Sequence, residues 1–421
     1  MESPAPDEAS ASRISSRLRL AVVVWAVLVS QVLLYPGLDG LIVALGAPGS
    51  IRAGMWFLVA EFAAFVAFAV VWGAASDTLG RRVPLVVAGA FGGAASYLLL
   101  TLVPTLGVGF AGALAVRVIG GAFTIGAFSL AITMLMDIAG GNGRNMGAAG
   151  IAIGLGAALG SVAGGQLSTL SAFGPVYAGA AVLAGAGLLA ATVPDTIATD
   201  SETASGSGGR TTAGSNRDLG AAVDALRSQP ALGVPFAFGF VDRLTAGFFS
   251  LIGVFYFGDV FGLDAAGVGI ALALFFVPFA LLQYPLGSLS DRIGRFLPVV
   301  AGSMGYGVTI IAVGLAPTVD VAMAVMVLVG LAGAFVAPAT MALVSDLVDP
   351  ADRGVAMGGF NVFGSLGFLT GFLIGGVVGS STDYLTAFLV VGGLEIGIAI
   401  VALPAVRRLA STPSLAESTA D

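Results

Sequence analysis

The stretch Gly73-Ala-Ala-Ser-Asp77-Thr-Leu-Gly80-Arg81-Arg82 ends a long apolar run, and the chain contains a second copy of it. The second copy reads Gly287-Ser-Leu-Ser-Asp291-Arg-Ile-Gly294-Arg295. Two glycines, an aspartate and an arginine recur 214 positions later, and a proline follows each copy. The duplication predicts a chain made of two homologous halves.

Each copy has the composition of a short loop between two membrane helices. Glycines allow a tight turn, and arginines hold a loop on the cytoplasmic side of a membrane. Asp77 and Asp291 can pair with the loop arginines or cap the positive N-terminus of a neighbouring helix. A plain hairpin turn explains the arginines but not an aspartate at the same place in both copies. We therefore favour a functional role for the motif.

The composition excludes a soluble globular protein. Of the 421 residues, 57% are hydrophobic and only 10% are charged. Runs of about 20 apolar residues, each long enough to cross a bilayer, fill most of the chain. The sequence therefore predicts an all-α polytopic membrane protein embedded in the lipid bilayer.

Several chemistries are excluded because cysteine, histidine and lysine are all absent. Without them there are no disulfides, no thiolate or imidazole metal sites, no Ser-His catalysis and no phosphate-binding loop with its lysine. We expect no metal, no cofactor and no enzymatic activity. Proton chemistry must use carboxylates.

The charge balance is acidic, with a formal net charge of -7. An acidic, lysine-free protein suits a salt-rich cytoplasm, which indicates a halophilic source, although GC-rich coding would also remove lysine. Nucleic acid is not an expected partner.

The apolar runs predict twelve membrane helices in two sets of six. The expected ranges are 20–45, 53–75, 84–105, 108–138, 147–169, 174–194, 231–257, 266–289, 297–317, 320–347, 355–379 and 385–404. The predicted organisation is an N-terminal tail at 1–19, helical halves at 20–194 and 231–404, a Ser- and Gly-rich linker at 195–230 and a C-terminal tail at 405–421.

Arginine sets the expected orientation. Of the 17 arginines, 14 fall in tails and loops on one side of this arrangement, which predicts that both termini and the linker are cytoplasmic. The N-terminus lacks the features of a cleavable signal peptide. The expected location is the cell membrane, crossed many times.

The repeat continues in a second pair of loops and in a glycine-rich helix. Asp137 and Arg144 match Asp346 and Arg353 at an offset of 209, which predicts a charge pair in each loop. Glycines in the fifth helix recur in the eleventh at an offset of 211. Such rows let helix backbones approach closely in lipid.

With both motif copies, the chain resembles the major facilitator superfamily over nearly its whole length. The resemblance implies two pseudo-symmetric six-helix bundles, with the substrate at the midplane between them and alternating access by rocking. It also implies that Asp77, together with Arg81, gates the cytoplasmic mouth. A further family signature, Arg-x-x-Gln-Gly, is partly met by Arg117-Val-Ile-Gly120-Gly121, whereas Ser161 stands where the antiporter signature has proline.

Away from the loops and helix ends, six charged side chains fall within the predicted helices. They are Asp39, Glu61, Arg117, Asp242, Arg243 and Glu395. Each costs roughly 2.5–3.5 kcal/mol at a helix centre, so each should be paired or face a cavity.

Glu61 and Arg117 fall at matching depth in the second and fourth helices, so we expect them to meet. Their pairing could be purely structural or could couple transport to a cation, and the same alternatives hold for Asp242 with Arg243. Asp39 could cap a helix or contact substrate. Glu395 is interpreted as a packing hydrogen bond or an oligomer contact.

The favoured function is secondary active transport of a small organic solute, coupled to H⁺ or Na⁺, by a monomer. Export of drugs or metabolites is favoured over solute uptake by symport. A sensor on the same fold would usually carry a further signalling domain, for which the tails are too short. A membrane enzyme would have to rely on carboxylates alone.

Overall fold

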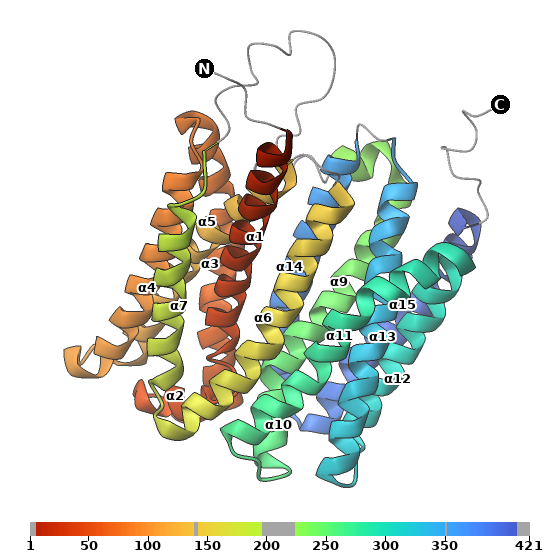
Figure 1. Cartoon of the computed structure of the whole chain (residues 1–421). Coiled ribbons are helices and arrows are strands. Elements are labelled where there is room, and N and C mark those ends of the chain that lie inside the picture. The colour runs from red at the N-terminus through yellow and green to blue at the C-terminus, as the bar shows by residue number, and fades with distance from the viewer. Residues whose placement is uncertain (1–5, 139–141, 196–223, 350–351, 411–421) are drawn as a thin grey trace, which may run out of the picture.

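The computed structural model describes residues 6–138, 142–195, 224–349 and 352–410, which form a bundle of long helices (Figure 1). The helices of the first half are α1 (Pro6–Val32), α2 (Leu38–Ala44), α3 (Ile51–Leu79), α4 (Val83–Leu106), α5 (Gly109–Asp137), α6 (Asn142–Leu170) and α7 (Gly174–Ala190). Those of the second half are α9 (Gly233–Phe248), α10 (Val254–Asp259), α11 (Ala265–Ile293), α12 (Gly302–Gly314), α13 (Val319–Asp346), α14 (Arg353–Ser381) and α15 (Tyr384–Ala410).

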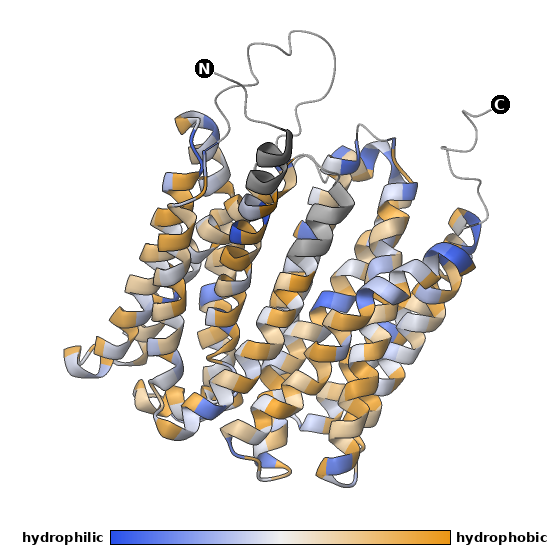
Figure 2. Ribbon diagram, viewed as in Figure 1, coloured by the Kyte–Doolittle hydropathy of each residue, from blue (hydrophilic) through white to orange (hydrophobic). Residues whose placement is uncertain are grey.

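Eleven of the described helical segments are long and apolar enough to cross a membrane, and α7 is a shorter apolar helix. At 17 residues, α7 is about 26 Å long, close to the thickness of a bilayer core of about 30 Å. Apolar residues cover the flanks of the bundle (Figure 2), as expected for a surface that faces lipid. The predicted all-helical membrane fold is confirmed.

The prediction of one continuous helix over 20–45 is wrong. The chain turns at residues 33–37, between α1 and α2. Pro36 explains the break, because proline lacks the N–H that a helix interior requires and its ring disfavours helical backbone at Tyr35. Asp39 therefore lies in the first turn of the short helix α2.

The predicted boundaries of the tails also differ from the structure. Helix α1 begins at Pro6, inside the predicted tail 1–19, and α15 continues to Ala410, inside the predicted tail 405–421. Most of the linker, residues 196–223, lies outside the described residues, although residues 224–228 at its end are helical.

Two helices widen locally into π-helical turns. Phe249–Gly253 continues α9 into α10, and Leu297–Ala301 leads into α12. The predicted seventh helix, 231–257, is thus one rod in three segments after a short 3-10 turn at Pro230–Leu232. Such π turns often occur near functional sites.

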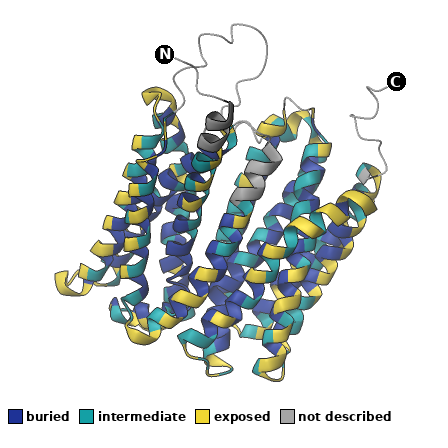
Figure 3. Ribbon diagram, in the orientation of Figure 1, coloured by how far each residue is buried: buried dark blue, intermediate teal, exposed yellow. Residues whose placement is uncertain are grey.

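Most helix contacts lie within each half of the chain. In the first half α3 and α4 pack on α5, and α1 packs on α6 and α7, while in the second half α9 packs on α14 and α11 on α13. The two halves meet through α6 with α11 and α3 with α14. Buried residues concentrate where helices face one another (Figure 3).

The two ends of the bundle differ in their loops. We call the end that carries Gly80–Arg82, Gly294–Phe296 and both termini the motif end, and the end that carries α2 and α10 the far end (Figure 1). At the motif end, α3 ends at Gly80, whose φ of 59° is left-handed. This backbone conformation favours glycine, which explains why the motif has glycine there.

Candidate functional site

The motif loops tie helices together at the motif end. Arg82 forms an ion pair with Asp137 at the end of α5. The backbone N–H groups of Arg82 and Val83 donate to the carboxylate of Asp195 at 3.2 and 3.3 Å, so this acid neutralises the positive start of α4. The first motif copy therefore links α4 to the ends of α5 and α7.

The second copy makes a corresponding link. Arg295 donates to Asp291 at 2.6 Å, to Asp346 at 3.0 Å and to Ser290 at 3.2 Å. The carboxylates of Asp291 and Asp346 raise the pKa of the Arg295 guanidinium against the opposing effect of its burial. Asp346 occupies the place in its half that Asp137 occupies in the first.

The predicted charge pair of Asp346 with Arg353 is therefore wrong, because Asp346 pairs with Arg295 instead. Asp137 pairs with Arg82 and Asp346 with Arg295, across neighbouring loops rather than within one loop. Arg353 instead donates to the backbone carbonyl of Ser345 at 3.3 Å. The side chain of Arg144 lies outside the described residues.

Asp77 is exposed at the motif end, as is Arg81. Within the described part of the chain, Asp77 forms no hydrogen bond or ion pair. The structure does not bring Asp77 and Arg81 into a salt bridge, and it leaves the Asp77 carboxylate available to another conformation.

Glu61 of α3 and Arg117 of α5 form an ion pair inside the first half. Only 3% of Glu61 and 2% of Arg117 are exposed. The guanidinium lies 4.4 Å from the centroid of the Phe57 ring, a cation–π contact. Neither partner is fully satisfied, because Oε1 of Glu61 and Nε of Arg117 have no hydrogen-bond partner.

A glycine allows the two helices of this pair to approach. A Cβ atom on Gly121 would lie 2.0 Å from the backbone oxygen of Glu61. In the sequence Arg117-Val-Ile-Gly120-Gly121, the arginine pairs with Glu61, and Gly121, one turn later, lets the backbone of α3 pack directly against α5.

Asp242, Arg243 and Glu395 lie in the middle of the second half. Asp242 is 5% exposed, and its Oδ1 atom has no hydrogen-bond partner. The stem of half-buried Arg243 runs along α14, where its Cγ lies 3.2 Å from the position of a Cβ on Gly364. No salt bridge joins Asp242 to Arg243 in the described residues, since consecutive helical residues point about 100° apart.

Glu395 is 1% exposed and bonds inside its own half. Its carboxylate accepts hydrogen bonds from Thr245 at 3.1 Å and from Ser303 at 2.7 Å. The interpretation as an oligomer contact is therefore wrong, and the interpretation as a packing hydrogen bond matches the geometry. Thr245 and Ser303 were missed, although each is a hydroxyl residue one helical turn from another polar residue.

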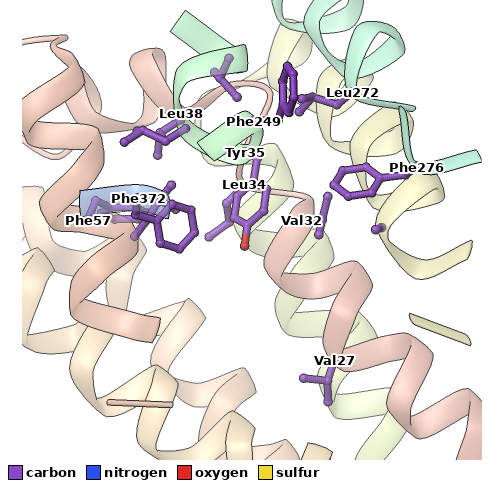
Figure 4. Close-up of a cluster of buried hydrophobic side chains, with 14 of the residues drawn as sticks. Val27, Val32, Leu34, Tyr35, Leu38, Phe57, Phe249, Leu272, Phe276 and Phe372 are labelled. Atoms are coloured by element: carbon purple, nitrogen blue, oxygen red, sulfur yellow. The ribbon is translucent and has the colours of Figure 1, made fainter. Parts of the chain in front are cut away.

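The two halves meet at the far end through apolar side chains. Near the middle of α3 and α14, the rings of Phe62 and Phe368 stack with centroids 4.8 Å apart. Nearer the far end, a Cβ on Gly54 of α3 would lie 2.8 Å from the Phe255 ring of α10. Figure 4 shows Tyr35 and Leu34, from the turn after α1, among Phe249, Phe276 and Phe372 of the second half. Contacts of this kind shut the far end.

Asp39 lies at the far end on the exposed side of α2. Partial burial beside Gly49 raises the pKa of its carboxyl, and the Asp259 carboxylate raises it further. The hydroxyl of Tyr384 donates to Asp259, which holds this second acid in place. Asp39 does not act as a side-chain cap of α2.

We expect acid to stabilise the protein through Asp39. A raised pKa means that the folded state takes up a proton before the unfolded chain does, so stability increases as pH falls through the raised pKa. Asp39→Asn should remove that gain, at most about 1 °C in unfolding temperature because the group is exposed. Thermal unfolding measured against pH tests this.

The control is Asp383→Asn, for which the sign is opposite. Hydrogen bonds from the Thr386 backbone and hydroxyl lower the pKa of Asp383, so its contribution is present above the unfolded pKa and is lost as pH falls through the lowered one. Identical pH dependence in both variants would contradict the assignment.

Among the described residues, no group of three or more His, Cys, Asp or Glu side chains could hold a metal ion. The candidate functional residues are thus two buried polar clusters, one in each half, and a charged network at the motif end. The carboxylates of these clusters are groups that can bind protons.

Comparisons with known proteins identify relatives over most of the chain. The sequence model of the Major Facilitator Superfamily matches residues 236–420. The class G tetracycline resistance protein of Vibrio anguillarum is 29% identical over 307 residues, which are 73% of this chain and 75% of that protein. The class C protein of Escherichia coli is 27% identical over 388 residues, 89% of this chain and 92% of that protein.

Solved structures share the fold. The nucleoside transporter NupG superposes with a TM-score of 0.70 at 18% identity, covering 94% of this chain and 100% of that one. The human organic anion transporter MFSD10 gives a TM-score of 0.66 at 21% identity, over 92% and 99% of the two chains.

Proposed function

This chain belongs to the major facilitator superfamily, a family of membrane transporters rather than enzymes, and from that premise we propose that it exports a small organic solute in exchange for protons. Its substrate would bind between the two halves, which would be exposed to each side of the membrane in turn. Distant relationship to tetracycline resistance proteins favours export over uptake.

The observation that carries the proposal is the buried ion pair of Glu61 and Arg117. A buried carboxylate paired with an arginine can exchange its partner for a proton when the helices around it move. The unpartnered Oε1 of Glu61 and Nε of Arg117 leave both groups able to bind something further. We rank Glu61 first and Asp242 second as the group that takes up the proton, and we assign Asp39 to substrate contact at the far end.

The conformation is consistent with a cycle of this kind. The halves meet closely at the far end, where Gly54 of α3 lies against Phe255, whereas Asp77 at the motif end has no partner among the described residues. We infer that Asp77 and Arg81 close the motif end in the opposite state. Because arginine clusters there, we place that end and both termini in the cytoplasm, with the protein in the cell membrane.

Flux into proteoliposomes tests the function. The purified chain should exchange a solute from a library of drugs, nucleosides, sugars and organic acids at equal pH, and an imposed pH gradient should drive its accumulation. Accumulation toward the acidic side indicates exchange against protons. Accumulation toward the alkaline side would indicate symport, and binding without any flux would indicate a sensor.

The Asp77→Asn variant tests the gating role of the first motif. It should lower flux about tenfold or more while leaving unfolding temperature unchanged, because the aspartate has no partner to lose in this state. Asp291→Asn in the second copy should have a milder effect on flux but should weaken the contact with Arg295. Normal flux in Asp77→Asn would leave the first motif with only the role of a turn.

A further inference from the structure

Three helices of the second half converge on one buried acid. Glu395 of α15 accepts from Thr245 of α9 through Oε1 and from Ser303 of α12 through Oε2. Both carboxylate oxygens are therefore held, at 1% exposure, in the interior of the half. Glutamine has only one acceptor oxygen and could accept only one of these two bonds, so the arrangement selects a carboxylate.

A second buried acid lies beside this one. Asp242 precedes Thr245 by three residues, so the two share a face of α9. Asp242 is within electrostatic reach of Glu395 and of Tyr306, which follows Ser303 by one turn on α12. Oδ1 of Asp242 and the hydroxyl of Tyr306 are both buried and have no hydrogen-bond partner.

Too few positive charges surround Asp242 and Glu395 to neutralise two carboxylates. Arg243 is the one cation within electrostatic reach of Asp242 in the described residues, and it forms no salt bridge there. Helices α13 and α14 also pack on α9, but their ionisable side chains, Asp320, Asp346 and Arg353, lie at their ends. Beyond Glu395, α15 carries Tyr384 at the far end and two arginines in its last turn.

Two ionised carboxylates so placed would repel each other with little solvent to screen them. One proton on the pair removes the repulsion and leaves a single negative charge to face Arg243. The unpartnered oxygens of Asp242 and Tyr306 supply places for a proton to be donated and accepted.

We propose that Asp242 and Glu395 form a proton-binding pair that holds one exchangeable proton, with the Tyr306 hydroxyl as its third polar group. This site is separate from Glu61, which already has a cation as its partner. A role for this proton in coupling rests on the proposed function, whereas its binding does not.

Infrared spectroscopy of the full chain in lipid tests the binding. The wild type at neutral pH should show the C=O band of a protonated carboxyl group, and alkalinisation should remove the band and release one proton. Both Glu395→Gln and Asp242→Asn should lack this band and this proton, because the remaining acid no longer faces a second carboxylate. Asp320→Asn, which removes an exposed carboxylate at the start of α13, is the control and should keep both.

Three results would overturn the pair. They are absence of the band in wild type, its persistence in both variants, and its loss in only one variant, which would assign the proton to a single acid. If Glu395→Gln does not fold, Glu395→Asp replaces it: the shorter acid is withdrawn from Thr245 and Ser303 and should shift the frequency of the band, and an unshifted band would assign the proton to Asp242 alone.

Transport measured on the same variants separates binding from coupling. We expect both to lose accumulation driven by a pH gradient while they retain exchange at equal pH. Unchanged accumulation in variants that lack the band would overturn the coupling role alone. Failure of the wild type to transport any solute would instead refute the proposed function and leave the proton pair standing.

Discussion

Arg117→Met should abolish accumulation driven by a pH gradient and should destabilise the protein by about 3–5 kcal/mol, because it leaves Glu61 buried without its cation. The guanidinium also packs over Phe57, a contact that methionine replaces only in part. Methionine fits such a position, since the matching residue of the second half is the fully buried Met326. The loss of stability and of accumulation in Arg117→Met should therefore result from the missing positive charge and not from a poorly fitting side chain.

Glu61→Gln and the double variant complete the test. Glu61→Gln leaves Arg117 buried without a counter-ion and should destabilise by a similar amount. The double variant removes both charges, so it should recover most of the stability, and the coupling energy follows from the cycle. Exchange at equal pH should persist in the double variant, whereas accumulation should not return.

Stability and gradient-driven flux measured on all four proteins separate the two interpretations of the pair. If both single variants keep accumulation, the pair is structural and the proton carrier lies elsewhere. If the double variant restores accumulation, a fixed charge pair is dispensable and Asp242 becomes the leading candidate.

The apolar runs of the sequence were sufficient to locate the helices, because lipid requires each crossing to be a long apolar run with its backbone bonds satisfied internally. These runs did not reveal the break after α1. The run carries no charged residue between Arg19 and Asp39, so composition alone does not mark the turn at Pro36. The helical start of α1 at Pro6 was missed for the opposite reason, since that segment is polar.

The candidate site was less predictable than the fold. Equal depth in two helices is enough to bring Glu61 and Arg117 together, because helix rise is fixed. The Asp346–Arg353 pair failed because sequence proximity does not decide which loops are neighbours: Arg295 of the adjacent loop reaches Asp346, as Arg82 reaches Asp137. The hydrogen bonds of Glu395 could not be predicted, because they form only where α9, α12 and α15 meet, and the spacing of residues within one helix does not show which helices meet.

The seam between the halves offers a test of their relative motion. An added Cβ on Gly269 of α11 would lie 2.4 Å from the backbone oxygen of Ser161, and one on Gly165 of α6 would lie 2.4 Å from that of Ala265. Backbone meets backbone at these points, so a side chain has no space to move into. If the halves rock, the two glycines are in contact only while the far end is shut.

Gly269→Val should therefore favour a state in which the far end is open. The branched side chain costs about 1–3 kcal/mol in the shut state and little once the helices separate, which is enough to shift the populations about tenfold. Because the chain has no cysteine, spin labels on Leu170→Cys and Leu315→Cys report the far end without background. Both sites are exposed, at 81% and 60%.

We expect a longer label distance and slower transport in Gly269→Val. Gly185→Val is the control, since nothing lies within 4 Å of its added Cβ, and it should change neither quantity. An unchanged distance with full transport in Gly269→Val would show that the α6–α11 seam does not open during the cycle.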